Sequence, residues 1–187
     1  MRTFFCLSLP AATREAIGRV AERLRRETRM SASWVGHELL HVTVRFLGDI
    51  EPDLLPALQR AAREAVRGVS PWETSLDRID AFPHLPRARV LWVGGEAPDS
   101  FRALTGRLEE QLQPLGFARD PLPNVAHVTI ARIKGAPDPR LDDLCRAPGL
   151  WKAQRFVAEQ LTLMQSELTP HGPRYLPLFR LPLDHER

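Results

Sequence analysis

Two tetrapeptides of one type stand out in the sequence, HVTV at 41–44 and HVTI at 127–130. Each lies in a run rich in β-branched residues, which is typical of a strand. Successive side chains of a strand point to opposite faces, so each histidine shares a face with its threonine while the intervening valine faces a core. The coincidence is improbable by chance, and we interpret His41, Thr43, His127 and Thr129 as one functional site.

Two imidazoles on opposite sides of one bound group suit in-line displacement at phosphorus. One can remove a proton from the attacking oxygen while the other gives a proton to the leaving oxygen. The hydroxyls of Thr43 and Thr129 can donate hydrogen bonds to the non-bridging phosphoryl oxygens, where negative charge grows. A cyclic phosphodiester fits this chemistry because its leaving oxygen stays tethered. Neither histidine role needs a metal ion, so we expect no metal and no other cofactor.

The elements that would position these residues can be predicted from hydrophobic periodicity. The first half predicts strand 3–9, helix 11–28, strand segments at 34–35 and 40–47, helix 52–66 and strand 72–82. The second half predicts strand 89–93, helix 101–115, strand 125–133, a short helix near 141–144 and strands 156–164 and 176–183.

A shift of 86 residues places 4–7 on 90–93 and His41 on His127, which indicates an old duplication. We therefore predict one domain, 1–187, with lobe-level repeats at roughly 1–86 and 87–187. Terminal strands could be exchanged between the lobes. A pseudo-twofold axis would make the two His-Thr pairs face one another across a cleft. Proline-rich loops at 82–87, 121–123 and 170–173 are predicted rims of that cleft.

Composition narrows the class of protein. The chain has 187 residues, 43% of them apolar and 26% charged, which fits a single globular domain. No run approaches the ~18 apolar residues of a membrane span. The formal charge of +3 indicates only a mild preference for anionic partners. Nothing demands more than a monomer.

Two further features bear on location. Cys6 and Cys145 cannot form a disulfide framework, which favours a reducing compartment, and we expect a cytoplasmic protein. The run 3–9 could pass for a short signal-peptide core. Pro10 ends this run and a charged helix follows it, so a buried first strand is the better interpretation.

Beyond the paired motifs, the sequence resembles the two-histidine (2H) phosphoesterase superfamily, and within it the bacterial RNA 2′,3′-cyclic phosphodiesterases, or 2′-5′ RNA ligases. The resemblance is carried by RTFF at 2–5, HVTVRFLG at 41–48, RVLWVG at 89–94, HVTIAR at 127–132 and SELTPHGPRY at 166–175. It implies a bilobal α+β fold with an antiparallel sheet in each lobe and helices on the outer faces. It also implies hydrolysis of RNA 2′,3′-cyclic phosphate ends, or of nucleoside 2′,3′-cyclic phosphates, to 2′-phosphomonoesters without metal or nucleotide cofactor. The resemblance further implies a reversible 2′-5′ RNA ligation.

The resemblance implies roles for individual residues. His41 would be the proton donor and His127 the proton acceptor, although the sequence alone leaves that order open. Thr43 and Thr129 would hold the phosphate. Arg132 aligns with a phosphate-binding arginine of the family, but in a regular strand it would share the face of the valine and isoleucine, so a bulge or the strand end must turn it.

The sequence itself indicates one further candidate site residue, Arg45, and two alternative functions. Arg45 is in phase with the first His-Thr pair, so it is either a cleft residue that contacts phosphate or a solvated surface arginine. The segment 37–41 matches the zinc-peptidase pattern HExxH, which requires one helical face and a third ligand. A non-catalytic module that binds RNA ends is the other alternative, though binding alone does not need two titratable groups.

Overall fold

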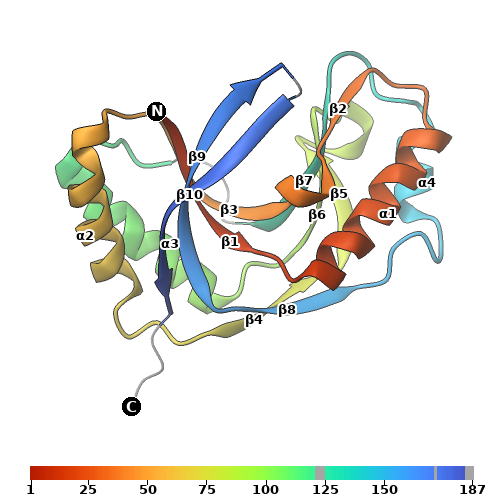
Figure 1. Cartoon of the computed structure of the whole chain (residues 1–187). Helices are drawn as coiled ribbons and strands as arrows, with labels where there is room; N and C mark the ends of the chain where they lie inside the picture. The colour runs from red at the N-terminus through yellow and green to blue at the C-terminus, as the bar shows by residue number, and fades with distance from the viewer. Residues whose placement is uncertain (121–124, 171, 184–187) are drawn as a thin grey trace.

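The computed structural model describes residues 1–120, 125–170 and 172–183 and has a mixed α+β architecture (Figure 1). Its strands and helices are β1 (Arg2–Ser8), α1 (Ala11–Glu27), β2 (Ala32–Trp34), β3 (His41–Asp49), α2 (Leu55–Val66), β4 (Trp72–Leu76), β5 (Arg78–Phe82), β6 (Val90–Gly95), α3 (Asp99–Leu112), β7 (Ala126–Ile133), α4 (Leu141–Arg146), β8 (Gln154–Ala158), β9 (Gln160–Thr169) and β10 (Gly172–Pro182). Short 3₁₀ helices cover His37–Leu39, Pro52–Leu54, Leu85–Arg87 and Gln113–Leu115. The predicted rim at 121–123 and residue 171 of the rim at 170–173 lie outside the described residues.

The strands form an eight-stranded sheet of order β10-β9-β1-β3-β7-β6-β5, with β2 paired to β7, and a two-stranded sheet of β4 and β8. Every pairing is antiparallel. The α+β class and the antiparallel sheets are therefore as expected. The expectation of one sheet per lobe differs from the structure, because β3 and β7 pair at Val42 and Val128 and join both halves into one sheet.

The 86-residue shift also relates two ladders of this sheet. In the β1–β3 ladder three successive pairs are Leu7–Val42, Cys6–Thr43 and Phe5–Arg45. The same shift gives, in the same order, three pairs of the β6–β7 ladder: Val93–Val128, Trp92–Thr129 and Leu91–Ala131. Both ladders shift register between the second and third of these pairs, which leaves Val44 and Ile130 as the extra residues of two β-bulges. A duplication would produce this agreement, and the lobe-level repeat remains a prediction.

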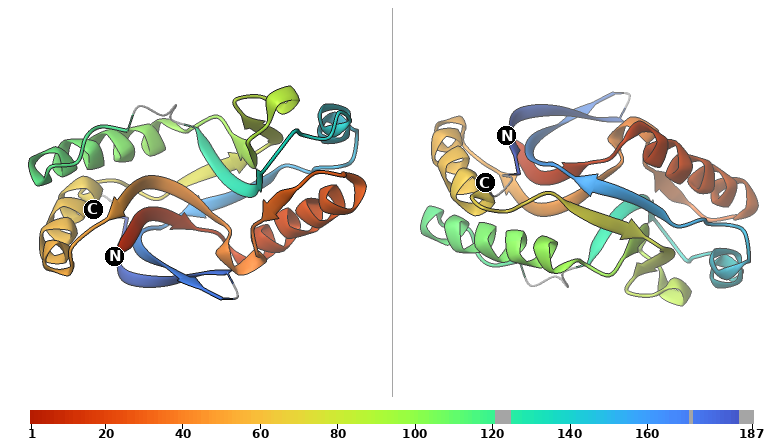
Figure 2. Two further views of the ribbon diagram at one scale, coloured as in Figure 1. Left: turned by 90° about the horizontal axis from the view of Figure 1, so that it is seen from above. Right: turned by 90° about the horizontal axis from the view of Figure 1, so that it is seen from below.

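The helices lie at the two ends of the molecule. Figures 1 and 2 show α2 and α3 side by side at one end and α1 with α4 at the other. Along α3, Phe101, Leu104, Leu108 and Leu112 recur at helical spacing and are buried in the core. Burial of each such side chain stabilises the fold by about 1.5–3 kcal/mol, so these residues anchor α3 in the hydrophobic core.

Two predicted strands are each divided in the structure. The predicted strand 156–164 is β8 followed by β9, which separate at Glu159 and belong to different sheets. The predicted strand 72–82 is β4 followed by β5 in the same way. The run at 3–9 forms the buried strand β1, as expected. Among the described residues, no helix has both the length and the apolar character needed to cross a bilayer.

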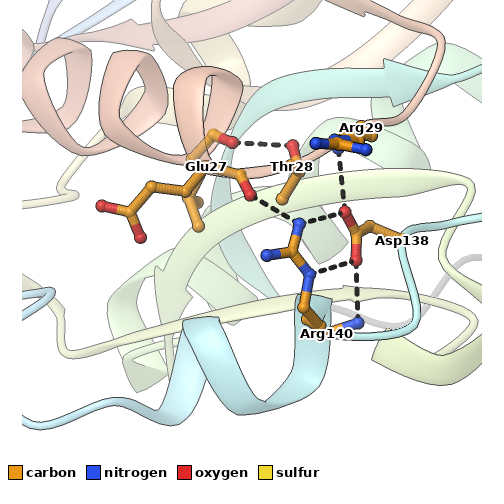
Figure 3. A network of polar contacts seen from close by, with 6 residues as sticks. Glu27, Thr28, Arg29, Asp138 and Arg140 are labelled. Carbon is orange, nitrogen blue, oxygen red and sulfur yellow. Dashed lines mark hydrogen bonds and ion pairs between the residues drawn. The ribbon is translucent and has the colours of Figure 1, made fainter.

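A network around Asp138 ties the end of α1 to the segment before α4 (Figure 3). The Asp138 carboxylate, 4% exposed, accepts hydrogen bonds from the backbone N–H groups of Arg29 and Arg140 and from the Arg140 guanidinium. Arg140 also donates to the carbonyl of Glu27 at 2.9 Å. These hydrogen bonds hold the pKa of Asp138 well below its usual range, so the carboxylate stabilises the fold in its charged form.

Candidate active site

Strands β3 and β7 bring the two tetrapeptides together at the centre of the sheet. Val42 and Val128 are direct partners and both are fully buried. In an antiparallel pair with this register, His41 is the cross-strand neighbour of Thr129, and His127 is the neighbour of Thr43. All four polar side chains therefore lie on the face opposite the valines. They are neighbours on one sheet, whereas we expected two separate sheets to face one another.

Both imidazoles are held by the carbonyl group two residues earlier in the chain. His41 Nδ1 lies 2.7 Å from the Leu39 oxygen, and His127 Nδ1 lies 3.0 Å from the Val125 oxygen. A carbonyl can only accept, so each Nδ1 carries a proton and donates. In the neutral ring each Nε2 is therefore the unprotonated nitrogen, and the Thr43 hydroxyl donates to His41 Nε2 at 3.0 Å.

Aromatic rings surround each histidine and restrict its rotation. Phe4 stacks on His41 with ring centroids 4.8 Å apart, and Tyr175 approaches the same imidazole edge-on at 5.4 Å. On the other side, Phe82 lies edge-on to His127 at 5.0 Å, and Trp92 is tilted toward it at 5.9 Å. These contacts fix the ring planes and exclude water from one side of each imidazole.

Burial and positive charge favour the neutral form of both histidines. Desolvation is the main cause that lowers the pKa of His41, and the charges of His127 and Arg132 lower it further. Desolvation and then Arg132 likewise lower the pKa of His127, against the opposing hydrogen bond to Val125. An anion bound between the rings would reverse part of this effect, since it stabilises an imidazolium.

The β-bulge of β7 explains the side of the sheet on which Arg132 lies. Ile130 is the extra residue, so Ile130 and Ala131 are both buried and Arg132 returns to the exposed side. Its charge acts on both imidazoles, and its side chain lines the same cavity as His127 and Thr129. In a regular strand Arg132 would share the face of Val128 and Ile130, but the bulge interrupts this alternation before Arg132.

Arg45 follows the equivalent bulge of β3 and has protein partners. Its Nε lies 2.5 Å from Glu109 of α3, its Nη1 lies 3.7 Å from Asp120, and it also donates to the Ala118 carbonyl. Its side chain is only 11% exposed. The phosphate contact predicted for Arg45 stays a prediction, while the observed contacts tie β3 to α3 and to the segment before β7.

A cavity of about 630 Å³ opens beside His127 and reaches α3. Thr43, His127, Thr129 and Arg132 line it, together with charged side chains of α3 and of the segment that follows α3. Phe46, an aromatic side chain that is 41% exposed, is part of the wall. The sequence analysis did not select Phe46. The 86-residue shift aligns Phe46 with the candidate site residue Arg132, and this correspondence is the sequence signal that could have pointed to Phe46.

The HExxH pattern does not form the helix that a zinc peptidase needs. Its first three residues make a 3₁₀ turn, His37–Leu39, and His41 already belongs to β3. The imidazole of His37 packs against Gly18 of α1 and lies 4.0 Å from Glu22. In the part of the chain that the structure describes, no three His, Cys, Asp or Glu side chains gather in a way that could hold a metal ion.

Comparisons with known proteins agree with one another. The sequence model of the 2′-5′ RNA ligase superfamily matches residues 10–170. An RNA 2′,3′-cyclic phosphodiesterase of Methanothermobacter thermautotrophicus is 30% identical over 184 residues, which cover 97% of this chain and 99% of the relative. One of Aeropyrum pernix is 33% identical over 170 residues, covering 88% and 95%.

Solved structures extend the likeness to the fold. The crystal structure of TT0787 of Thermus thermophilus superposes with a TM-score of 0.82 at 27% identity and covers 100% of both chains. The apo structure of E. coli LigT gives a TM-score of 0.74 at 26% identity and covers 98% of both.

Proposed function

The chain belongs to the 2′-5′ RNA ligase superfamily, and from this premise we propose that it is an RNA 2′,3′-cyclic phosphodiesterase. The reaction is hydrolysis of a 2′,3′-cyclic phosphate end to a 2′-phosphomonoester. The observation that supports it most strongly is the matched pair of imidazoles on β3 and β7. Each is fixed through Nδ1 and offers Nε2 on the same face of the sheet.

In the proposed mechanism the two histidines act on opposite sides of one phosphorus. His127 Nε2 takes a proton from water as the water oxygen bonds to phosphorus, and His41 Nε2 gives a proton to O3′ as the P–O3′ bond breaks. The phosphate stays on O2′. The order of the two roles is carried over from the family resemblance. Because burial lowers the pKa of both histidines and favours their neutral form, His41 would acquire its proton as the anionic substrate binds.

Three side chains would stabilise the charge on the reacting group. The hydroxyls of Thr43 and Thr129 flank the histidines, and the Arg132 guanidinium reaches the same cavity. A guanidinium can bind two phosphoryl oxygens at once, so it can stabilise the negative charge that these oxygens carry in the transition state. Since imidazoles carry both proton transfers and Arg132 carries the countercharge, the proposed scheme needs no metal ion.

Phe46 is proposed to bind the terminal nucleobase. Its ring lies in the wall of the larger cavity, and the Arg2 guanidinium lies 5.0 Å above the ring centroid. A half-exposed aromatic ring is a stacking surface for an unpaired base, and stacking discriminates little between bases. We therefore propose a substrate that is a single-stranded RNA end, with weak base preference.

Ligation would be the same displacement with a different nucleophile. If a 5′-hydroxyl replaces water at His127, the same displacement joins two RNA ends through a 2′-5′ linkage and leaves O3′ protonated. Action as a monomer in the cytoplasm is part of the proposal. The cytoplasmic location is supported by the two cysteines, which are free and buried.

The test is hydrolysis of an oligoribonucleotide with a 2′,3′-cyclic phosphate end in the presence of EDTA, followed by ³¹P NMR of the product. We expect a 2′-phosphomonoester at an undiminished rate. Binding without turnover would favour the RNA-end binding module. Loss of activity in EDTA would favour a metal-dependent reaction, and a 3′-phosphate product would contradict the proposed cleavage of the P–O3′ bond.

A further inference from the structure

A second cavity, of about 370 Å³, opens beside His41 and has no part in the scheme above. It lies along β1, the start of α1 and β10, and Phe4, Ser8, Arg14, Arg174 and Tyr175 line it together with His41. His127 lines only the larger cavity, so each histidine borders a different one.

The charges of this second cavity favour an anion. Arg14 and Arg174 line it against one carboxylate, that of Glu38. Arg14 is held in place by a hydrogen bond to the Leu9 carbonyl at 2.9 Å. Arg174 lies on β10 and is exposed. Two guanidinium groups of this kind are suited to a phosphodiester.

The rest of the wall fits a nucleoside. Phe4 and Tyr175 meet edge-on with ring centroids 4.9 Å apart, and Met164 and Leu9 add apolar surface. The hydroxyls of Ser8 and Tyr175 supply polar groups that can reach a ribose. A cavity of this volume can hold a short segment of an RNA chain but not a long one.

The proposed mechanism gives the direction of the RNA chain. His41 protonates O3′ of the terminal ribose, so that ribose lies at the His41 side of the phosphorus. The same ribose carries at C5′ the phosphodiester that leads to the preceding nucleotide. The chain therefore leaves the reacting centre toward the cavity that His41 borders, while the terminal base lies against Phe46 in the larger cavity.

We infer that the cavity beside His41 is a subsite for the phosphodiester and nucleotide that precede the cyclic-phosphate end. The inference rests on the proposed function and makes its substrate class narrower. The enzyme acts on the end of an oligoribonucleotide in preference to a mononucleoside 2′,3′-cyclic phosphate, because only the former fills both cavities.

The experiment compares adenosine 2′,3′-cyclic phosphate with the dinucleotide ApA bearing a 2′,3′-cyclic phosphate. For the unaltered protein we expect kcat/KM to be on the order of tenfold higher for the dinucleotide, as one charged hydrogen bond to phosphate provides. Arg174→Gln should remove most of that advantage and leave the mononucleoside rate unchanged. Arg180→Gln, an exposed arginine on the same strand that does not line the cavity, should change neither rate.

Equal kcat/KM for both substrates, or an equal loss for both in Arg174→Gln, would overturn the subsite. Calorimetric binding of ApA 2′-phosphate and of adenosine 2′-phosphate tests the same point without turnover. There, Arg174→Gln should weaken the dinucleotide alone, by roughly tenfold. An absence of hydrolysis with this binding pattern intact would reject the proposed function and keep the subsite, whereas equal affinities of both ligands would reject the subsite.

Discussion

Substitution of Gly94 by alanine should disturb the site at His127. Gly94 is the direct partner of His127 in the β6–β7 ladder. A Cβ placed on Gly94 would lie 2.6 Å from the Ala126 carbonyl oxygen, 2.9 Å from the Trp92 ring and 3.0 Å from the Cα of His127. Two of these atoms belong to β7 backbone, so relief of the clash must move the strand that carries the histidine.

The size of the effect follows from these distances. The Ala126 oxygen must retreat by about 0.4 Å to reach even a tight contact, and His127 must move with it. A displacement of ~1 Å at a reacting group costs about 10²-fold in rate, so roughly tenfold is expected in kcat for Gly94→Ala. Overpacking of this kind also destabilises a fold by about 1–3 kcal/mol, which lowers Tm by a few degrees.

The assay is kcat on an oligonucleotide cyclic phosphate at a temperature well below both Tm values. Gly135→Ala is the matched control, because a Cβ there would meet nothing within 4 Å and the backbone has no positive φ. The control should keep normal kcat and Tm. Wild-type kcat in Gly94→Ala would refute the view that the close approach of β6 and β7 positions His127.

Four other predictions follow from the same structure. His41→Ala and His127→Ala should each lower kcat by on the order of 10²- to 10⁴-fold with an unchanged circular dichroism spectrum, and near-normal turnover in either variant would exclude its acid–base role. Thr43→Ala should cost less, about 10- to 100-fold, whereas a loss as large as that of the histidine variants would mean that it also sets the position of the imidazole. Because the pKa values of both histidines are lowered, the bell-shaped pH profile of kcat/KM should have its optimum below ~6.5. Arg132→Gln removes a positive charge that lowers both pKa values, so it should move this optimum to higher pH. An optimum that does not move would contradict the electrostatic effect of Arg132 on the histidines. Asp138→Asn should lower Tm at neutral pH, because the ionised carboxylate of Asp138 stabilises the fold. A carboxyl with a lowered pKa stabilises the fold only while it is ionised, so the difference in Tm between the two proteins should shrink as the pH falls below ~4. A difference in Tm that stays constant with pH would show that the charge is not the cause.

The sequence predicted the fold class and the side-chain faces well because both depend on local periodicity. The alternation in HVTV and HVTI correctly placed the valines in the core and each histidine beside its threonine. The sequence could not predict that β3 and β7 are partners, because strand pairing depends on contacts between distant segments. The single cross-strand pair of Val42 with Val128 is what converts two strand patterns into one site.

The remaining differences come from irregular backbone. A β-bulge at Ile130 reverses the phase that periodicity assigned to Arg132, and nothing in the side-chain pattern marks it. The equivalent bulge at Val44 precedes Arg45, whose ion pair with Glu109 depends on where α3 packs. The predicted strand 156–164 ran through the break between β8 and β9, although the polar residues Glu159 and Gln160 interrupt its apolar pattern there.

The most direct test of the paired mechanism is a crystal structure with adenosine 2′-phosphate, the product, in the site. We predict that His41 Nε2 lies within hydrogen-bond distance, about 2.7–3.2 Å, of the ribose O3′, and that His127 Nε2 lies at a similar distance from a phosphate oxygen on the opposite side of phosphorus. A bound nucleotide that contacts only one imidazole, or whose phosphate lies away from both, would contradict the account.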